Sequence, residues 1–524
     1  MSSSVPPGDA LVVGSGFGGS IAACRLAQAG HSVTVLERGR RYRPGDFPRD
    51  VTDIDALFWR RRRGGQATGL YDLRFFSDLG CVVAAGVGGG SLVYANVNVR
   101  PDHVVFDDPR WPTGTNRAGL DPYYQRVARM LEVAPLPIGQ VLPKREQFHL
   151  AAARMGRTVF DPDESVHWPT GTGTRRSSTH KPCEFCAECE FGCQVGAKRT
   201  ADSTYLAEAQ RLGAIVRPGR LVVAVRPVAA GFAVTHRDVV TGVEEVSVAK
   251  RVVVAAGTLG TNELLLRCRD EHRSLPALSD ELGNGFSANG DFLGSIHKAD
   301  IDLSPNLGPD VTSIMRFFEE APGFTLAAPT FNEAVMTALA NLGQPSARAL
   351  HPIAPLLWRL LPWAVPQMFA HGLLSKPLKY LAPGKLDWRR STNLFGIGRD
   401  NANGQLRLRR GGLDLVWNYR AENAELIDRQ QQAMSALTAT YGGKYAPLVF
   451  WNAFRRTVTV HPLGGCRMSS SPTGGVVSPE GAVHGYPGLF VADGSIVPTS
   501  IGFHPAMTIS ALAERTADAV VASF

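Results

Sequence analysis

Residues 9–37 read DALVVGSGFGGSIAACRLAQAGHSVTVLE, and this stretch decides the fold class. Ala10 to Val13 form a short apolar run that is typical of a buried parallel strand. His31 to Leu36 form a second run rich in β-branched residues, and Glu37 follows it directly. The two runs are joined by a G-x-G-x-x-G turn that consists of Gly14, Gly16 and Gly19. The order of strand, glycine turn, helical segment, strand and acid predicts the βαβ unit of a dinucleotide-binding α/β domain.

Each glycine of the turn has its own expected task. Gly14 permits the tight turn after the strand, Gly16 lets a pyrophosphate approach the backbone, and Gly19 lets helix and strand pack closely. The N-terminus of the helix then faces the phosphate charge. Glu37 stands where a carboxylate can accept hydrogen bonds from a ribose diol. This pattern by itself is compatible with FAD and with NAD.

A second glycine-rich loop favours FAD. Residues 86–96 read GVGGGSLVYAN, with four glycines in five positions, and mostly apolar segments flank them. Such a backbone passes very close to another group or adopts positive φ repeatedly. A flexible surface loop is not expected between apolar segments. The sequence therefore predicts a buried loop that contacts the ligand beside the first glycine turn.

Three further segments carry a resemblance to a known family. They are RVVVAAGTLGTNELLL (251–266), TVHPLGGCRM (459–468) and GYPGLFVADGSIVPTSIGFHPAMTISALAER (485–515). With these segments and the two glycine loops in this order, the sequence resembles the glucose–methanol–choline (GMC) oxidoreductase family, and within it the cholesterol-oxidase-like branch. The resemblance implies an FAD-dependent oxidoreductase that acts on CH–OH donors.

The resemblance also implies which residues hold FAD, grouped here by the part of the cofactor that they would contact. They are Gly14, Gly16, Gly19 and Glu37 at the ADP portion, Gly88, Gly90, Ser91 and Asn96 on the pyrophosphate and isoalloxazine side, Val222 at the adenine, Ala256 and Gly257 near the nucleotide, Asp493 and Gly494 at the ribityl chain, and Met507 close to the flavin ring.

His461 and His504 match the catalytic pair of the family. Alcohol oxidation by a flavin removes a proton from the hydroxyl and a hydride from the carbon, so a proton acceptor must lie over the flavin. Histidine is suitable because its pKa lies near working pH. Cholesterol oxidases carry asparagine at the position of His504, together with a catalytic glutamate from the substrate domain. Glu319, Glu320 and Glu333 are available for that role, and none stands in a recognisable frame.

The segments that match the family are far apart in the chain, so we expect a discontinuous Rossmann-type FAD-binding domain with an inserted α+β substrate domain. The expected FAD-binding domain comprises residues 1–100, 201–295 and 455–524. The expected substrate domain comprises residues 101–200 and 296–454, and an alternating segment at 405–417 predicts a hairpin within it.

An apolar, proline-rich segment at 350–384 belongs to the expected substrate domain. Its prolines forbid one long helix. One interpretation is a set of short buried helices. The other is a lid that admits a lipophilic substrate or rests on a bilayer, since leucines and tryptophans stand beside basic residues.

Four of the eight cysteines lie in CEFCAECEFGC (183–193), which has the spacing C-x2-C-x2-C-x3-C. Such a run can hold an iron–sulfur cluster, although no partner run exists in the chain. Zinc is a second interpretation, because thiolates suit a tetrahedral site. A structural loop with free thiols or one disulfide is the third. The metal ligands would be Cys183, Cys186, Cys189 and Cys193.

Composition excludes several classes of protein. The formal net charge is +8, from 55 basic and 47 acidic residues, and the run Arg60–Arg63 is its sharpest cluster, interpreted as a solvated surface. Neither zinc-finger spacing nor an aromatic RNA-binding signature is present, so no nucleic-acid partner is expected. We find no signal peptide and no apolar run long enough to span a bilayer. Scattered cysteines fit a cytoplasmic location, with peripheral membrane contact through 350–384 as an option.

Together these features predict an FAD-dependent enzyme that oxidises a hydroxyl group of a hydrophobic alcohol. By resemblance the substrate is sterol-like, which would place the chain in steroid metabolism. Oxygen or an electron carrier would accept the electrons. One alternative is a carrier-linked alcohol dehydrogenase with an iron–sulfur cluster on the cysteine run. A second alternative, from another class, is a non-catalytic flavoprotein sensor, against which the presence of both histidines speaks.

Overall fold

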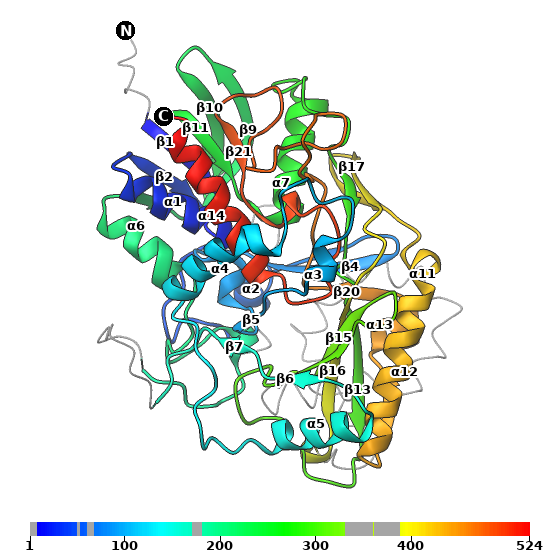
Figure 1. Cartoon of the computed structure of the whole chain (residues 1–524). Helices are drawn as coiled ribbons and strands as arrows, with labels where there is room; N and C mark the ends of the chain where they lie inside the picture. Colours follow the sequence, from blue (N-terminus) through cyan, green and yellow to red (C-terminus); the bar gives the residue numbers. More distant parts are fainter. Residues whose placement is uncertain (1–7, 50–52, 60–67, 170–180, 331–359, 361–387) are drawn as a thin grey trace.

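The computed structural model describes residues 8–49, 53–59, 68–169, 181–330, 360 and 388–524, and two sheets organise it (Figure 1). The first sheet has the order β8-β2-β1-β11-β10-β9, with β21 paired to β11. Its strands are β1 (Gly8–Val13), β2 (Val33–Leu36), β8 (Ile215–Arg217), β9 (Arg220–Val228), β10 (Gly231–Asp238), β11 (Glu244–Val254) and β21 (Leu489–Val491).

The centre of this sheet is parallel. Strand β1 pairs in parallel with β2 and β11, and β11 pairs in parallel with β21. Residues Ala10 to Val13 are apolar and almost completely buried, as a parallel strand covered on both faces requires. Strands β9 and β10 extend the sheet in antiparallel fashion. The sheet thus combines segments from the start, the middle and the end of the chain, and the predicted discontinuous α/β fold is confirmed.

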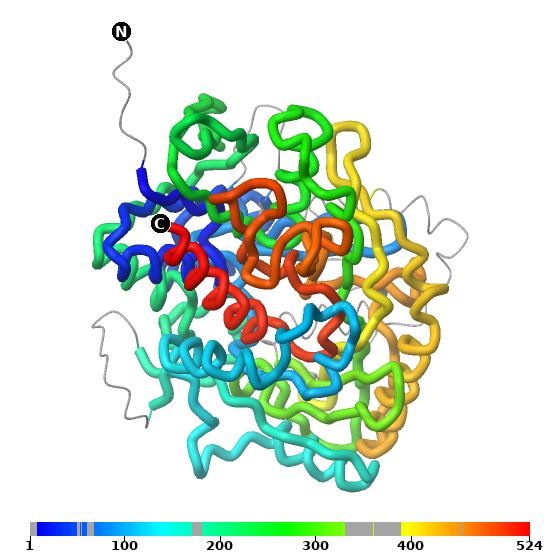
Figure 2. The backbone as a smooth tube through the Cα atoms, turned by 45° about the horizontal axis from the view of Figure 1, so that its top comes forward, coloured from blue at the N-terminus to red at the C-terminus, as the bar shows by residue number. Residues whose placement is uncertain are grey.

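Two helices from opposite ends of the chain cover this sheet. Helix α1 (Phe17–Gln28) lies against α14 (Ala506–Ala522), as the blue and red segments show in Figures 1 and 2. The guanidinium of Arg25 donates to both oxygens of the buried carboxylate of Glu514, and the Tyr205 hydroxyl donates to the same carboxylate. These contacts anchor the C-terminal helix on the first βαβ unit.

The second sheet is antiparallel and has the order β19-β13-β16-β15-β14-β6. Its strands are β6 (Val159–Phe160), β13 (Phe292–His297), β14 (Ile314–Phe317), β15 (Phe324–Ala327), β16 (Thr392–Gly398) and β19 (Lys444–Pro447). Helix α12 (Ala424–Thr440) packs on this sheet through buried residues such as Met434, and α5 (Pro143–Arg154) contacts α12. The domain boundaries stay a prediction; β13 lies across the expected boundary at 295.

Short strands connect the two sheets. They are β3 (Tyr71–Phe75), β4 (Leu79–Ala84) and β20 (Thr457–Thr459) in one group, β12 (Asn284–Phe286), β17 (Gly404–Arg409) and β18 (Gly412–Val416) in another, and the pair β5 (Val97–Asn98) and β7 (Asp163–Glu164). Strands β17 and β18 form the hairpin predicted at 405–417. The remaining α-helices are α2 (Ile54–Leu57), α3 (His103–Phe106), α4 (Arg117–Met130), α6 (Ala207–Arg211), α7 (Gly257–Leu266), α11 (Tyr419–Glu422) and α13 (Val449–Phe454).

Several predictions fall on parts of the chain outside the described residues. They concern the basic run Arg60–Arg63, the glutamate Glu333 and almost all of the apolar segment 350–384. Within the described ranges, no helix has the length and apolar character needed to cross a membrane.

Candidate active site

The glycines of the first turn differ in the space around them: Gly14 and Gly19 are tightly packed, whereas Gly16 is not. Gly14 has a φ of +92°, and a Cβ there would lie 2.3 Å from the carbonyl oxygen of Ala255. A Cβ on Gly19 would lie 2.0 Å from the Gly14 oxygen, so helix α1 could not approach β1 as it does. The nearest atom to a Cβ on Gly16 is the Gly89 Cα at 3.9 Å. The space beside Gly16 is therefore open to a ligand, as the motif predicts.

Glu37 lies at the end of β2, behind this turn. Its carboxylate accepts hydrogen bonds from the Ser15 backbone N–H at 3.0 Å, the Ser15 hydroxyl at 2.7 Å and the Gly39 N–H at 2.8 Å. Burial raises the pKa of the Glu37 carboxyl, and these hydrogen bonds oppose the rise. Glu37 thus fixes the glycine turn directly, while its contact with a ribose stays a prediction.

The second glycine loop touches the first. A Cβ on Gly89 would lie 2.6 Å from the Gly16 Cα, and the Gly88 N–H donates to the Ser15 hydroxyl at 3.1 Å. Ser91 holds the loop in shape, because its hydroxyl donates to the Gly88 oxygen and accepts from the Ala201 N–H. A Cβ on Gly90 would meet nothing within 4 Å. The two loops therefore form one continuous glycine surface.

Asn96 provides the test of whether this surface fits a cofactor. The residue is completely buried, has a φ of 66°, and its side-chain oxygen and nitrogen both lack a hydrogen-bond partner. Buried amides without partners are rare because each unpaired group costs about 1–3 kcal/mol. The donor and acceptor of Asn96 are the groups that a flavin ring or a pyrophosphate can satisfy. The residues present thus fit FAD.

The remaining FAD residues surround Asp493, at the end of β21. One carboxylate oxygen accepts from the Gly257 N–H at 3.0 Å and the Thr261 hydroxyl at 2.5 Å, while the other accepts from the Ser495 N–H. Burial raises the pKa of Asp493 against these bonds. The other residues of the predicted set lie as follows: Val222 in β9, Ala256 and Gly257 at the start of α7, Gly494 after β21, and Met507 in the first turn of α14.

The two predicted catalytic histidines lie together. His461 follows β20 and His504 precedes α14, and their ring centroids are 5.7 Å apart at an interplanar angle of 77°. The ring of Phe395, from β16, stacks on His461 at 5.5 Å and meets His504 edge-on at 6.4 Å. Three segments that are distant in sequence thus converge on one cluster of rings.

A buried acid that the sequence did not single out contacts the first histidine. Asp291 is completely buried, and its Oδ1 lies 3.0 Å from His461 Nδ1. Glu319 and Glu320, considered earlier for a catalytic carboxylate, are instead exposed and pair with arginines. Only one signal could have indicated Asp291: it is a lone acid in the glycine-rich, otherwise uncharged stretch GNGFSANGDF (283–292).

His504 has different surroundings. Only 6% of the residue is exposed, and neither ring nitrogen has a hydrogen-bond partner among the described residues. Burial, with a smaller contribution from His461, lowers the pKa of His504 to about 3. Asn289 holds the loop before it, because its oxygen accepts from the N–H groups of Ile501 and Gly502 and its amide donates to the Phe503 oxygen. His504 is therefore a neutral ring in a fixed position.

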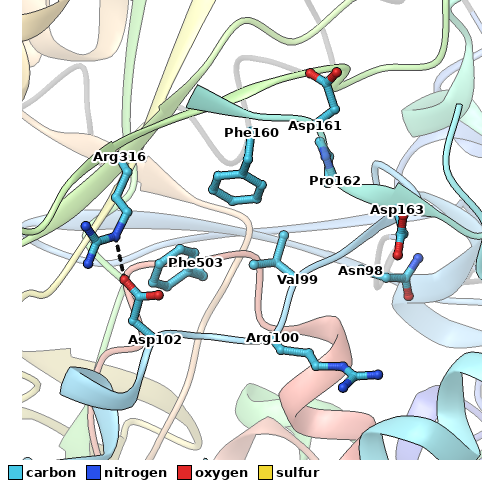
Figure 3. A pocket seen from close by; sticks show the side chains of 10 residues that line it. All are labelled: Asn98, Val99, Arg100, Asp102, Phe160, Asp161, Pro162, Asp163, Arg316 and Phe503. Atoms are coloured by element: carbon cyan, nitrogen blue, oxygen red, sulfur yellow. Dashed lines mark hydrogen bonds and ion pairs between the residues drawn. The ribbon is translucent and has the colours of Figure 1, made fainter. Parts of the chain in front are cut away.

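A small cleft of about 330 Å³ reaches Phe503, the neighbour of His504 (Figure 3). Phe160, Val99 and Phe503 lie toward its middle, and an ion pair of 2.5 Å between Arg316 and Asp102 borders it. The residues that line it are Asn98, Val99, Arg100, Asp102, Phe160, Asp161, Pro162, Asp163, Arg316 and Phe503. Its charged rim is unsuited to an apolar molecule, and we do not assign the substrate to it.

The predicted metal site on the cysteine run is not supported. Among the described residues, which include the whole run, no group of three or more His, Cys, Asp or Glu side chains could hold a metal ion, and the cysteines are free thiols. Burial raises the pKa of Cys183 to about 12 and that of Cys189 well above its usual value. Backbone contacts determine the shape of the run instead: Arg49 donates to the Phe191 and Gly192 oxygens, and Lys198 to the Cys189 oxygen.

A Rossmann-type sheet with two touching glycine loops, together with a pair of histidines that the fold brings into contact, is typical of a nucleotide-dependent oxidoreductase. Family models of the N- and C-terminal parts of the GMC oxidoreductases match residues 10–272 and 414–513, and the chain belongs to this family. It is accordingly an FAD-dependent oxidoreductase that acts on CH–OH donors, and the family prediction from sequence is confirmed.

Relatives that match nearly the whole of this chain include two kinds of alcohol oxidase. A cholesterol oxidase from Acinetobacter baumannii is 29% identical over 546 residues, which cover 97% of this chain and 93% of that protein. A long-chain-alcohol oxidase from Arabidopsis thaliana is 24% identical and covers 98% of this chain and 67% of that protein. The solved structure of pyridoxine 4-oxidase from Mesorbium loti superposes with a TM-score of 0.64 at 17% identity over 98% of each chain, which shows a shared fold.

Proposed function

We propose that this chain oxidises a hydroxyl group of a hydrophobic alcohol, sterol-like or long-chain, with His461 as the proton acceptor and oxygen as the final electron acceptor. The observation that carries the proposal is the cluster of His461, His504 and Phe395, in a chain whose two glycine loops fit FAD. The names of the relatives, a cholesterol oxidase and a long-chain-alcohol oxidase, support the substrate class and the acceptor.

Each part of the cluster has a task in this reaction. His461 accepts the hydroxyl proton as the carbinol C–H bond breaks and the carbonyl forms. His504, a neutral ring, donates or accepts a hydrogen bond at the same oxygen and so orients it. Bound FAD supplies the two-electron acceptor for the hydride. Oxygen would be the final acceptor of these two electrons and, with two protons, would leave as hydrogen peroxide.

The apolar ring of Phe395 favours a hydrophobic substrate over a sugar. It stacks on one face of His461 and meets His504 edge-on, while His504 is almost fully buried. A polyol would leave its additional hydroxyl groups unpaired against such a surface, which costs free energy for each buried group. The cluster therefore suits an isolated hydroxyl on an apolar body.

The experiment is anaerobic reduction of the enzyme-bound flavin by a panel of alcohols. The panel contains a 3β-hydroxysteroid, a long-chain primary alcohol, an aryl alcohol and glucose as the polar control. We expect one of the hydrophobic alcohols to bleach the oxidised-flavin absorbance, and readmitted oxygen to restore it with formation of hydrogen peroxide. If dithionite reduces the flavin but none of the alcohols does, the proposal is wrong. Reduction by glucose alone would contradict the hydrophobic class.

His461→Ala tests the proton acceptor. Loss of a general base typically slows a reaction by about 10²- to 10⁴-fold, and the glycine loops do not depend on this side chain. We therefore expect normal flavin content and a flavin reduction rate lowered by that factor. The matched control is His484→Ala, because His484 is a half-buried histidine whose Nε2 contacts the Ser469 carbonyl oxygen away from the pair. An unchanged rate in flavin-loaded His461→Ala would contradict the assignment.

A further inference from the structure

We propose that Asp291 is a positioning residue that holds His461 in the Nδ1–H tautomer, so that Nε2 is the proton-accepting atom and the two histidines cannot exchange roles. The inference rests on the proposed alcohol oxidation, and it assigns a task to a residue outside both histidine motifs. It is argued from the contacts of one carboxylate.

The two oxygens of Asp291 have separate partners. Oδ2 accepts from the Val460 N–H at 2.9 Å, the His461 N–H at 3.2 Å and the Thr459 hydroxyl at 2.8 Å. Oδ1 faces His461 Nδ1 at 3.0 Å. An ionised carboxylate only accepts hydrogen bonds, so Nδ1 must carry the proton and the lone pair must lie on Nε2. The same carboxylate then stabilises the imidazolium that forms when Nε2 takes a proton.

His504 lacks every one of these features. Within the part of the chain that the structure describes, no acid contacts its ring, and both of its nitrogens are buried without a hydrogen-bond partner. Protonation there is opposed by burial and by His461, which lowers the pKa of His504 to about 3. Of the two rings, only His461 has a counter-charge for the protonated state. The pair is thus asymmetric: one ring takes the proton, and the other offers a neutral hydrogen bond.

The other titratable groups near Asp291 do not supply a competing charge. They are Cys81 on β4, Glu190 in the cysteine run and Tyr419 in α11, and burial raises the pKa of each, which favours the uncharged form of each side chain. Arg74, on the neighbouring strand β3, is paired with Asp72 and Glu263. Among the described residues, Asp291 is the acid in hydrogen-bond contact with the His461 ring.

Asp291 also supports the backbone near His461, and an experiment must distinguish this support from its effect on the His461 tautomer. Asn289 holds residues 501–503 before His504, and Asp291 holds residues 459–461. Both side chains come from the turn before β13, so this turn sets the distance between the two histidines. A rate decrease alone would not distinguish loss of this support from loss of the tautomer.

Asp291→Asn is the informative substitution, because it keeps the shape of the side chain. The amide oxygen must face the two backbone N–H groups of Val460 and His461, which places the amide NH₂ against His461 Nδ1. Nδ1 then has to accept a hydrogen bond, and the ring proton moves to Nε2. We expect full flavin content and a flavin reduction rate about 10³- to 10⁴-fold lower, as for a histidine base in the wrong tautomer. The pH dependence of that rate should also shift to a lower apparent pKa.

Nitrogen-15 NMR of the histidine rings gives a readout that does not require turnover. The His461 signals are assigned by their absence in His461→Gln. We expect a protonated Nδ1 in the wild-type holoenzyme and a protonated Nε2 in Asp291→Asn. A wild-type ring protonated at Nε2 would overturn the proposal even if the variant failed to fold. A wild-type flavin that no alcohol reduces would instead refute the proposed function and leave the tautomer result standing.

Asp161→Asn is the matched control. Among the described residues, Asp161 forms another His–Asp contact, 2.7 Å from His149 Nε2, apart from the ring cluster. Its substitution should leave the pH profile and the His461 signals unchanged. If Asp291→Asn lowers the rate with an unchanged tautomer and pH profile, and in parallel with a loss of melting temperature or flavin, the role of Asp291 is only structural and the proposal is wrong.

Discussion

Alanine substitution of two neighbouring glycines should have opposite effects on folding and on cofactor binding. A Cβ on Gly18 would lie 1.4 Å from the carbonyl oxygen of Ala492, at the end of β21. A Cβ on Gly16 would meet nothing closer than 3.9 Å, and the φ of −67° at Gly16 is one that alanine adopts freely. Folding therefore requires glycine at position 18, whereas at position 16 only ligand binding requires it.

The magnitudes follow from these contacts. Gly16→Ala should leave the unfolding free energy of the cofactor-free protein unchanged or raise it by about 0.4–1 kcal/mol, because alanine lowers the entropy of the unfolded chain. A methyl group in the path of the pyrophosphate should cost about 1–3 kcal/mol of binding, or about 5- to 150-fold in the Kd of FAD. Gly18→Ala should cost about 3 kcal/mol or more of folding free energy, since backbone must move.

The assay compares melting of the cofactor-free proteins with FAD titration by fluorescence quenching. We expect Gly16→Ala to melt at the wild-type temperature and to bind FAD weakly, and Gly18→Ala to melt early or to accumulate unfolded. Two results would refute the reasoning: wild-type FAD affinity in Gly16→Ala, or equal destabilisation by both substitutions. Either would mean that the open space beside Gly16 is not where the pyrophosphate lies.

Two further predictions concern buried ionisable groups. Glu37→Ala should lower FAD retention through dilution and gel filtration, and also the melting temperature, since three hydrogen bonds to Ser15 and Gly39 are lost; the flavin that remains bound should be reduced at the wild-type rate. His504 has a folded-state pKa of about 3, below the unfolded value of 6.5, so unfolding takes up a proton between these values and stability falls as the pH is lowered. From pH 6 to pH 4 the wild type should therefore lose about 2–3 kcal/mol more in urea unfolding than His504→Asn, and equal losses would contradict a neutral, buried His504.

The fold and the contact between the two glycine loops could be predicted because their signals are local. The apolar run of β1, the glycine turn and the strand before Glu37 lie within residues 9–37, and each glycine has a consequence that neighbouring residues determine. The hairpin at 405–417 followed from alternation of apolar and polar residues in the same way. His461 and His504 were found because each lies in a distinctive segment of its own.

The cysteine run shows where local spacing is insufficient. Four cysteines in eleven residues are compatible with a metal site and with a structural loop. The outcome depends on Arg49 and Lys198, which lie outside the run and bind its carbonyl oxygens. Their positions are set by the packing of distant segments, so spacing could not decide between the interpretations.

The sequence by itself determined the α/β class, the two glycine loops and the identity of the two histidines. Only the tertiary structure showed that Asp291 contacts His461 and that the ring of Phe395 packs against both histidines. Asp291 and His461 are 170 positions apart, and Phe395 reaches them from a third segment. Such contacts depend on how the second sheet packs against the first, because a side chain in a turn before a strand has no periodic pattern that reveals its partner.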